Sequence, residues 1–201
     1  MSHYFKYIIP IVAVKLVIFF IISCNADDFD QKSDTMQFYV DTSLLSTRIY
    51  LENSNISLKP PIDWILISEQ ESTQLSIAIK DGDNIFEILL SNVFKSQNGA
   101  LMIISQVQSK VNNFGYIPPD YKELLTQQFS IKDIPSLKFP INEIPILQYL
   151  ISTNEFVIIR IFIDSIANYQ IDYIIPRNIY EKELKKVESS IGSINKTKEV
   201  K

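Results

Sequence analysis

The chain has 201 residues, of which 46% are hydrophobic and 21% are charged, and its formal net charge is −4. This size and apolar content suffice for one domain with a substantial core, and the mildly acidic balance does not indicate a nucleic-acid partner. Only four glycines are present, and neither GxGxxG nor GxxxxGKS/T occurs, which excludes the common phosphate-binding loops.

The amino-terminal segment has the pattern of a secretory signal. Lys6 and Lys15 are basic, and Leu16–Ile22 is wholly apolar. A membrane-spanning helix needs about 20 mostly apolar residues. Pro10 and Lys15 interrupt the run, so it is short for a span but long enough for a signal peptide. An uncleaved anchor or an ordinary secretory signal remains the alternative to the lipoprotein signal described next.

The signal ends at Cys24, the only cysteine, in the order Ile21-Ile22-Ser23-Cys24. This ending resembles the lipobox of bacterial lipoproteins. The resemblance implies that diacylglycerol is attached to Cys24, that the chain is cleaved before it, and that the new amino terminus is acylated. Such double acylation gives stable membrane attachment. Asn25, where an aspartate would favour inner-membrane retention, favours the outer membrane, and exposure at the cell surface stays open.

With processing at Cys24, the chain is predicted to divide into four parts. These are a signal peptide over 1–23, a lipidated flexible tether over 24–35, one α+β domain over 36–194, and a disordered tail over 195–201. It removes His3, the only histidine, and changes the formal net charge from −4 to −6, because Lys6 and Lys15 are lost. A Ser-His-Asp triad, a Cys-His pair and a histidine-bound zinc site are then excluded. We expect no cofactor and no metal.

The first half of the domain predicts short strands. Alternating apolar residues indicate strands over 47–52, 56–59 and 75–79, and another apolar run covers 63–67. A turn is predicted at 81–84, since Gly82 is flanked by Asp and Asn. Its spacing lacks the downstream Glu of an EF-hand, so calcium is not expected. Strands over 85–94 and 100–108 flank Asn98-Gly99, a strong hairpin signal.

The second half predicts one short helix and then three strands. Apolar residues at helical spacing indicate a helix over 121–129. Three prolines between 131 and 145 argue against a long regular element there. That segment would either offer an apolar contact surface or cover one face of the sheet. Strands are expected over 146–151, 156–163 and 169–175, joined by short connections as an antiparallel meander. The second should be buried on both faces, and the third mainly on one.

The last element is predicted to be a helix. Asn178 can cap it, with Glu181 three residues later in capping-box spacing, and Gly192 is a plausible stop. One apolar stripe recurs at steps of four and three residues: Tyr180, Leu184, Val187, Ile191 and Ile194. We expect this stripe to pack on the core, and a partner helix is the alternative.

Two segments resemble a known family. The segment 56–64, Ile-Ser-Leu-Lys-Pro-Pro-Ile-Asp-Trp, and the strand 169–176 followed by a helix containing Val187-Glu188-Ser189-Ser190-Ile191 resemble PsbP-like and DcrB-like domains. The resemblance implies an α+β fold, an antiparallel β-sheet sandwiched between helices with a long C-terminal helix. Relatives act in photosystem assembly, nuclear-transport regulation and bacterial envelopes, usually by binding proteins. The resemblance carries no catalytic residue.

The candidate binding surface comprises Trp64, Tyr116, Pro118, Pro119 and Arg160. Trp64 could line a cleft or belong to the core, and Arg160 could bind an anion or pair with a carboxylate. The predicted function is a non-enzymatic, membrane-anchored envelope lipoprotein that presents its domain to a protein partner. The alternative is a lipoprotein that binds a small solute, or a hydrolase with two carboxyl groups about 5–9.5 Å apart.

Overall fold

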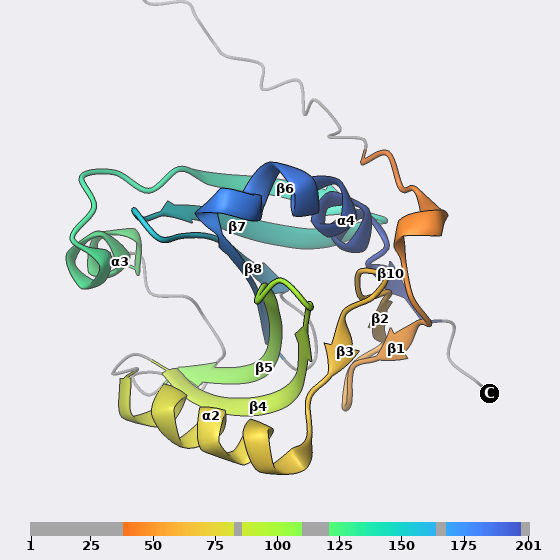
Figure 1. Ribbon diagram of the computed structural model, residues 1–201, viewed down its shortest axis with the longest axis horizontal. Helices are drawn as coiled ribbons and strands as arrows, with labels where there is room; N and C mark the ends of the chain where they lie inside the picture. The colour runs from red at the N-terminus through yellow and green to blue at the C-terminus, as the bar shows by residue number, and fades with distance from the viewer. Residues whose placement is uncertain (1–37, 83–85, 110–120, 164–167, 198–201) are drawn as a thin grey trace, which may run out of the picture. The chain divides into compact units, whose positions relative to one another are not determined.

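The computed structural model describes residues 38–82, 86–109, 121–163 and 168–197 (Figure 1). The chain divides into two units, Met1–Asp34 and Thr35–Lys201, and every described residue belongs to the second. Four predicted functional residues therefore lie outside the described part of the chain: Cys24, Tyr116, Pro118 and Pro119. Within the described part, no helix has the length and apolar character needed to cross a membrane.

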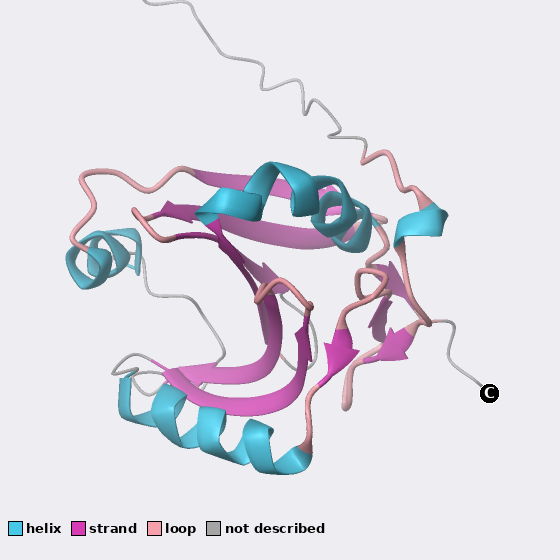
Figure 2. Cartoon of the chain, in the orientation of Figure 1, coloured by secondary structure: helices cyan, strands magenta, loops and turns pink. Residues whose placement is uncertain are grey.

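The described residues form two antiparallel sheets (Figure 2). The larger has seven strands in the order β3-β4-β5-β9-β8-β7-β6. Its strands are β3 Ile65–Leu66, β4 Phe86–Lys95, β5 Leu101–Ser109, β6 Ser136–Ile141, β7 Ile144–Ser152, β8 Phe156–Ile163 and β9 Tyr169–Pro176. The smaller has the order β1-β2-β10, with β1 Ile49–Tyr50, β2 Ile56–Leu58 and β10 Asn195–Lys196. The helices are α2 Glu69–Gly82, α3 Tyr121–Phe129 and α4 Tyr180–Gly192, with 3-10 turns η1 Thr42–Leu44 and η2 Arg177–Ile179.

Helices cover both faces of the seven-stranded sheet, which confirms the predicted α+β fold class. On one face, Val187 and Ile191 of α4 share a buried cluster with Ile171 and Tyr173 of β9. On the other face, α3 contributes Tyr121 to a second cluster, which also contains Leu125, Phe86 and Phe162. This division follows from the strand period of two, because successive side chains point to opposite faces.

Several predicted elements are confirmed. Helix α3 has the expected bounds, and β7, β8 and β9 are consecutive neighbours, as a meander requires. Strands β4 and β5 form the expected hairpin, in which Gly99 has a φ of 86°. Its amide donates to the carbonyl of Ser96 at 3.2 Å. Glycine suits this position because it adopts positive φ without a steric penalty.

The C-terminal helix is confirmed, but its predicted cap is wrong. Residues 177–179 form η2, and Ile179 precedes α4 without a side-chain cap bond, so Asn178 does not cap the helix. Gly192 is the last residue of α4, although it lacks the positive φ of a glycine stop. A Cβ atom there would lie 2.7 Å from both Phe38 Cβ and Val40 Cγ2. Gly192 therefore allows the segment 38–40 to approach α4.

The strand predicted over 75–79 is wrong, because these residues belong to helix α2. The Oγ atom of Ser68 accepts from the amide of Glu71 at 3.4 Å, and the carboxylate of Glu71 accepts from the amide of Ser68 at 3.2 Å. This reciprocal capping box starts a helix. The alternation over five residues was too short to outweigh it.

The prolines of 131–145 were predicted to prevent a long regular element, and the segment contains a strand of six residues. Residues 136–141 form β6, which joins β7 through a two-residue turn. Asn142 and Glu143 have φ values of 46° and 65°, as a type I′ hairpin turn requires. Pro140 is tolerated because β6 lies at the edge of the sheet, where a missing amide breaks no ladder bond.

Two further expectations need correction. Residues 195–201 were expected to be disordered, but Asn195 and Lys196 pair with β2 as strand β10. Strand β9 was expected to be covered mainly on one face, yet its polar residues Gln170 and Asp172 are 4% and 6% exposed. The polar side of β9 is therefore buried as well, and its side chains need partners inside the fold.

Candidate functional site

Trp64 belongs to the core, with 4% of its surface exposed. Its indole N–H donates to Glu183 Oε2 at 3.2 Å, and its ring lies edge-on to Tyr173 with centroids 6.4 Å apart. Glu183, in turn, lies 3.3 Å from Lys186 Nζ. Of the two readings of Trp64, this environment favours the core over the wall of a cleft.

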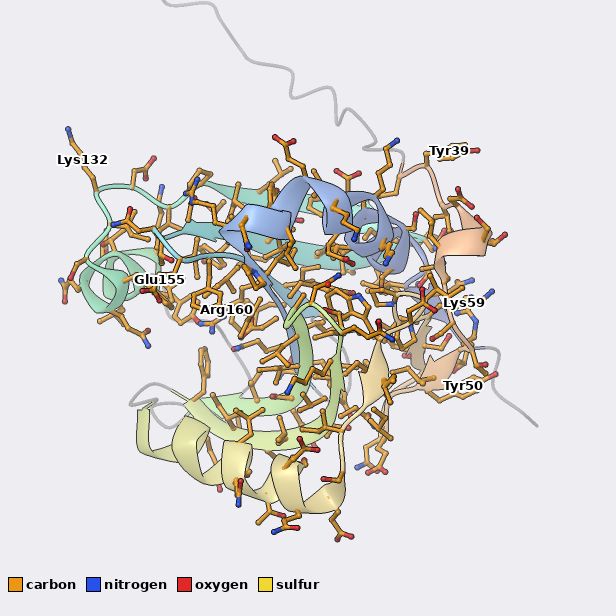
Figure 3. All side chains as sticks on the ribbon, viewed as in Figure 1. Tyr39, Tyr50, Lys59, Lys132, Glu155 and Arg160 are labelled. Carbon is orange, nitrogen blue, oxygen red and sulfur yellow. The ribbon has the colours of Figure 1, made fainter. Side chains whose placement is uncertain are left out.

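Arg160 lies within a buried network between α3 and the sheet (Figure 3). Its Nε and Nη2 atoms donate to the two carboxylate oxygens of Asp172, each at 2.8 Å. Its Nη1 atom donates to Tyr121 Oη at 2.6 Å. The amide of Gln170 also donates to Asp172, at 2.8 Å. The Asp172 carboxylate thus balances the arginine's charge through a bidentate pair, the strongest geometry for such a contact.

The network is suited to holding the fold together. Burial by itself lowers the pKa of the Arg160 guanidinium, but Asp172 and Tyr121 outweigh it and raise that pKa above its ordinary range. The side chains of Arg160 and Asp172 are only 12% and 8% exposed. Because carboxylate and phenol occupy its three nitrogens, Arg160 is not available to an incoming anion. One atom of this cluster, Gln170 Oε1, has no hydrogen-bond partner among the residues that the structure describes.

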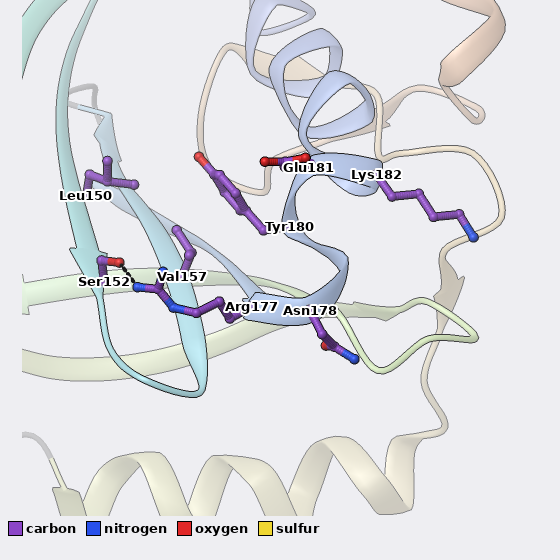
Figure 4. Close-up of a pocket in the computed structure, with 8 residues that line it drawn as sticks. All are labelled: Leu150, Ser152, Val157, Arg177, Asn178, Tyr180, Glu181 and Lys182. Atoms are coloured by element: carbon purple, nitrogen blue, oxygen red, sulfur yellow. Dashed lines mark hydrogen bonds between the residues drawn. The ribbon is translucent and has the colours of Figure 1, made fainter.

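A pocket of about 590 Å³ lies where β7, β8 and the start of α4 meet (Figure 4). Its apolar lining is formed by Leu150, Val157 and Tyr180. Its polar lining is formed by Ser152, Arg177, Asn178, Glu181 and Lys182. Burial raises the pKa of the Tyr180 phenol, with a further contribution from Glu188, so this ring is neutral at physiological pH. The size falls in the range of about 300–1,000 Å³ found for small-ligand sites.

Arg177 crosses from η2 to the turn between β7 and β8. Its Nη2 atom donates to Ser152 Oγ at 2.6 Å, and its Nε atom donates to the carbonyl of Thr153 at 2.9 Å. Both acceptors are uncharged, and among the described residues no carboxylate forms an ion pair with this guanidinium. Arg177 is exposed, and its guanidinium contacts two neutral acceptors without an ion pair to any described residue.

The pocket holds one carboxyl group, that of Glu181. A hydrolase of the two-carboxylate type needs a pair facing the same substrate. No group of three or more His, Cys, Asp or Glu suited to a metal ion occurs within the described ranges.

Strand β3 is one edge of the seven-stranded sheet, and both of its side chains are exposed, Ile65 by 66% and Leu66 by 54%. The amide of Ile67 donates to the carbonyl of Val93 at 3.0 Å. Backbone groups alternate between the two sides of an antiparallel strand, so the N–H and C=O of Leu66 point away from β4. No strand of the described chain pairs with that side. We call Ile65 and Leu66, with this outer backbone, the β3 edge.

Strand β6 is the opposite edge, and its outward side differs. The amide of Leu150 donates to the carbonyl of Pro135 at 3.0 Å. By the same alternation, the backbone of Lys138 and Pro140 faces outward. Proline offers no N–H to an added strand, and lysine brings a charge, so both oppose pairing at an edge.

Neither the pocket nor the β3 edge was predicted from the sequence. Ser68-Glu69-Gln70-Glu71 begins a helix directly after Ile65-Leu66, which limits β3 to a short strand beside its buried anchor Trp64. That capping box was the signal available for the edge. Arg177 directly follows the last residue of β9. No local sequence pattern could indicate the role of Arg177, because its hydrogen-bond partners lie 24 and 25 residues earlier in the chain.

No protein-family model matches the chain, and no curated protein matches it. Solved structures that are similar to it include the following two. The solution structure of cyanobacterial PsbP, CyanoP, from Synechocystis has 9% sequence identity and a TM-score of 0.46, and the match covers 75% of this chain and 91% of that one. A crystal structure from Bacteroides thetaiotaomicron has 12% identity and a TM-score of 0.41, with 78% of this chain and 50% of that one covered. Both are likenesses of overall arrangement only.

Proposed function

We propose that the chain is a non-enzymatic envelope lipoprotein, anchored through Cys24, whose folded domain binds an extended segment of a protein partner at the β3 edge. The anchor is supported by the sequence: basic residues, a short apolar run, and one cysteine placed as in a lipobox. The lipid would confine the domain to a membrane surface and so raise its local concentration near partners there.

The observation that carries the binding role is the β3 edge. An exposed sheet edge offers main-chain donors and acceptors to an added strand, and its side chains supply specificity. Here two adjacent large apolar residues are more than half exposed, next to an outward N–H and C=O. The strand has only two residues, so few hydrogen bonds form, and burial of Ile65 and Leu66 would supply much of the affinity.

Tyr50 lies at a second open edge, in β1 of the smaller sheet, and is 67% exposed (Figure 3). Unlike the β3 edge, β1 also exposes a phenol hydroxyl, which is well hydrated. The β3 edge therefore has the stronger apolar drive for association.

Two experiments test the two parts separately. For the anchor, cells are labelled with a fatty-acid probe, and Cys24→Ala is expected to abolish incorporation. Full incorporation in that variant would refute the anchor.

For the partner, the lipidated protein is recovered from solubilised membranes as wild type, as Ile65→Lys with Leu66→Lys, and as Leu137→Lys. Leu137 is the matched control, since it is an exposed leucine, 43% accessible, on the opposite edge. The double variant should lose the proteins that wild type and Leu137→Lys recover. Recovery of the same proteins by all three would exclude the β3 edge as the interface.

A further inference from the structure

We propose that the pocket beside η2 binds a small monocarboxylate with an apolar body, with Arg177 holding the carboxylate. This site is separate from the β3 edge, and the inference does not depend on the partner proposed for that edge. It rests on three observations: the state of Arg177, the mixed lining of the pocket, and the directions of the two other charged side chains.

The first observation is the contrast between two arginines. Arg160 uses all three nitrogens on Asp172 and Tyr121, and the Asp172 carboxylate balances its charge. Arg177 uses Nε and Nη2 on neutral acceptors, and its Nη1 atom makes no hydrogen bond to the described residues. A guanidinium whose position is already fixed loses little conformational entropy when an anion binds.

The second observation is the apolar lining. Leu150, Val157 and Tyr180 all line the pocket, and Val157 is drawn next to the guanidinium of Arg177 (Figure 4). Sites for small ligands combine such apolar walls with a few fixed polar groups that orient the ligand. An aliphatic or aromatic body can therefore be buried while its carboxylate meets Arg177.

The third observation concerns net charge. Figure 4 shows Lys182 extending away from Leu150, Val157 and Tyr180, whereas the carboxylate of Glu181 lies next to Tyr180. The lining carries two cations, Arg177 and Lys182, and one anion, Glu181, which leaves a net charge of +1. A ligand with a single negative charge suits this balance, while a dianion such as a phosphate monoester would be repelled by Glu181.

The test titrates the full chain with phenylpropionate, its neutral isostere phenylpropionamide, and acetate. Binding is followed by the methyl NMR signals of Leu150 and Val157. Phenylpropionate should shift these signals, and the amide and acetate should each bind about tenfold more weakly, because one lacks the charge and the other the apolar body. Equal affinity for acid and amide, or no shift of these methyl signals, would overturn the proposal.

Two matched variants locate the charge. Arg177→Gln should weaken phenylpropionate binding about tenfold, whereas Lys185→Gln, which removes the same charge from an exposed side chain outside the pocket lining, should leave it within about twofold. The opposite order would refute the role of Arg177. Because Arg177 also ties down the turn at Ser152, Arg177→Gln could disturb the fold. The comparison of acid with amide on the wild-type protein decides the question without that variant.

Discussion

The two edges of the seven-stranded sheet are built in opposite ways. The β6 edge carries Lys138 and Pro140 on its outward side, and both residue types hinder the addition of a strand. The β3 edge carries neither, and it exposes Ile65 and Leu66 instead. The β6 edge therefore opposes the addition of another strand, whereas the β3 edge permits it.

This difference shows that the β3 edge lacks the two residue types that oppose strand addition at β6. Strand β3 is also fixed from inside, since Trp64 directly before it is buried and hydrogen-bonded to Glu183. The pair is thus presented from a rigid base, which lowers the entropic cost of binding.

The largest expected effect is a loss of stability in the sheet that carries both edges. Strands β8 and β9 lie between the two edges, and Arg160 and Asp172 join them. Arg160→Ala would leave the Asp172 carboxylate buried without its counter-charge, which costs about 3–5 kcal/mol of unfolding free energy. Denaturant unfolding measures this loss, with Lys122→Ala as the control because its ion pair with Asp133 is exposed. A loss below about 1 kcal/mol would mean that the pair does not stabilise the sheet.

The second prediction separates main-chain from side-chain binding at the β3 edge. Leu66→Pro removes the outward N–H without breaking a bond to β4, because that amide faces away from β4. We expect partner affinity to fall about tenfold, since a hydrogen bond lost in a desolvated interface leaves its acceptor unpaired. Leu66→Val is the control, and affinity is measured by titration of the captured partner. Unchanged affinity in Leu66→Pro would rule out strand addition and leave an apolar contact alone.

The third prediction opens the closed edge. Lys138→Val with Pro140→Val removes the charge and restores an outward N–H on β6. The variant should self-associate at roughly 10–100 μM, a range in which unpaired edges aggregate. Sedimentation at increasing concentration detects this, with wild type run beside it. A variant that stays as monodisperse as wild type would show that these two residues do not protect β6.

The smallest expected effect is a change in how the free energy of unfolding depends on pH in alkaline solution. Burial raises the pKa of the Tyr173 phenol, and the hydrogen bond to Ser190, 2.9 Å long, only partly opposes this. A phenol with a raised folded-state pKa is neutral in the fold. Its contribution to the free energy of unfolding is therefore fully present below the unfolded-state pKa of about 10. That contribution is lost as pH rises toward the folded-state pKa. Tyr173→Phe should therefore flatten the fall in stability above about pH 10, as thermal unfolding across pH would show. An unchanged slope would contradict the assignment.

Much of the fold could be predicted from the sequence, because its signals are local. A nearly continuous apolar run predicted β8, alternation predicted β9, Asn98-Gly99 predicted the β4–β5 hairpin, and helical spacing predicted α3. The strand predicted over 75–79 was wrong because a short alternating pattern there competed with a stronger helix signal nearby. The capping box of Ser68 and Glu71 outweighed the alternation over 75–79.

The sites were harder to predict, because they depend on strand order. Pro140 reads as a breaker until β6 is known to be an edge strand. Ile65 and Leu66 read as core residues, since an apolar run gives no sign of which strand lies outermost. Arg177 gains its role only when the turn at Ser152 and Thr153 folds beside it.

The most direct test of the β3 edge is photo-crosslinking in cells from a reactive residue placed at position 66, compared with the same residue at position 137. The asymmetry of the edges predicts a discrete protein adduct from position 66 that disappears in Cys24→Ala, and none from position 137. Adducts of equal yield from both positions, or an adduct from position 137 alone, would contradict it.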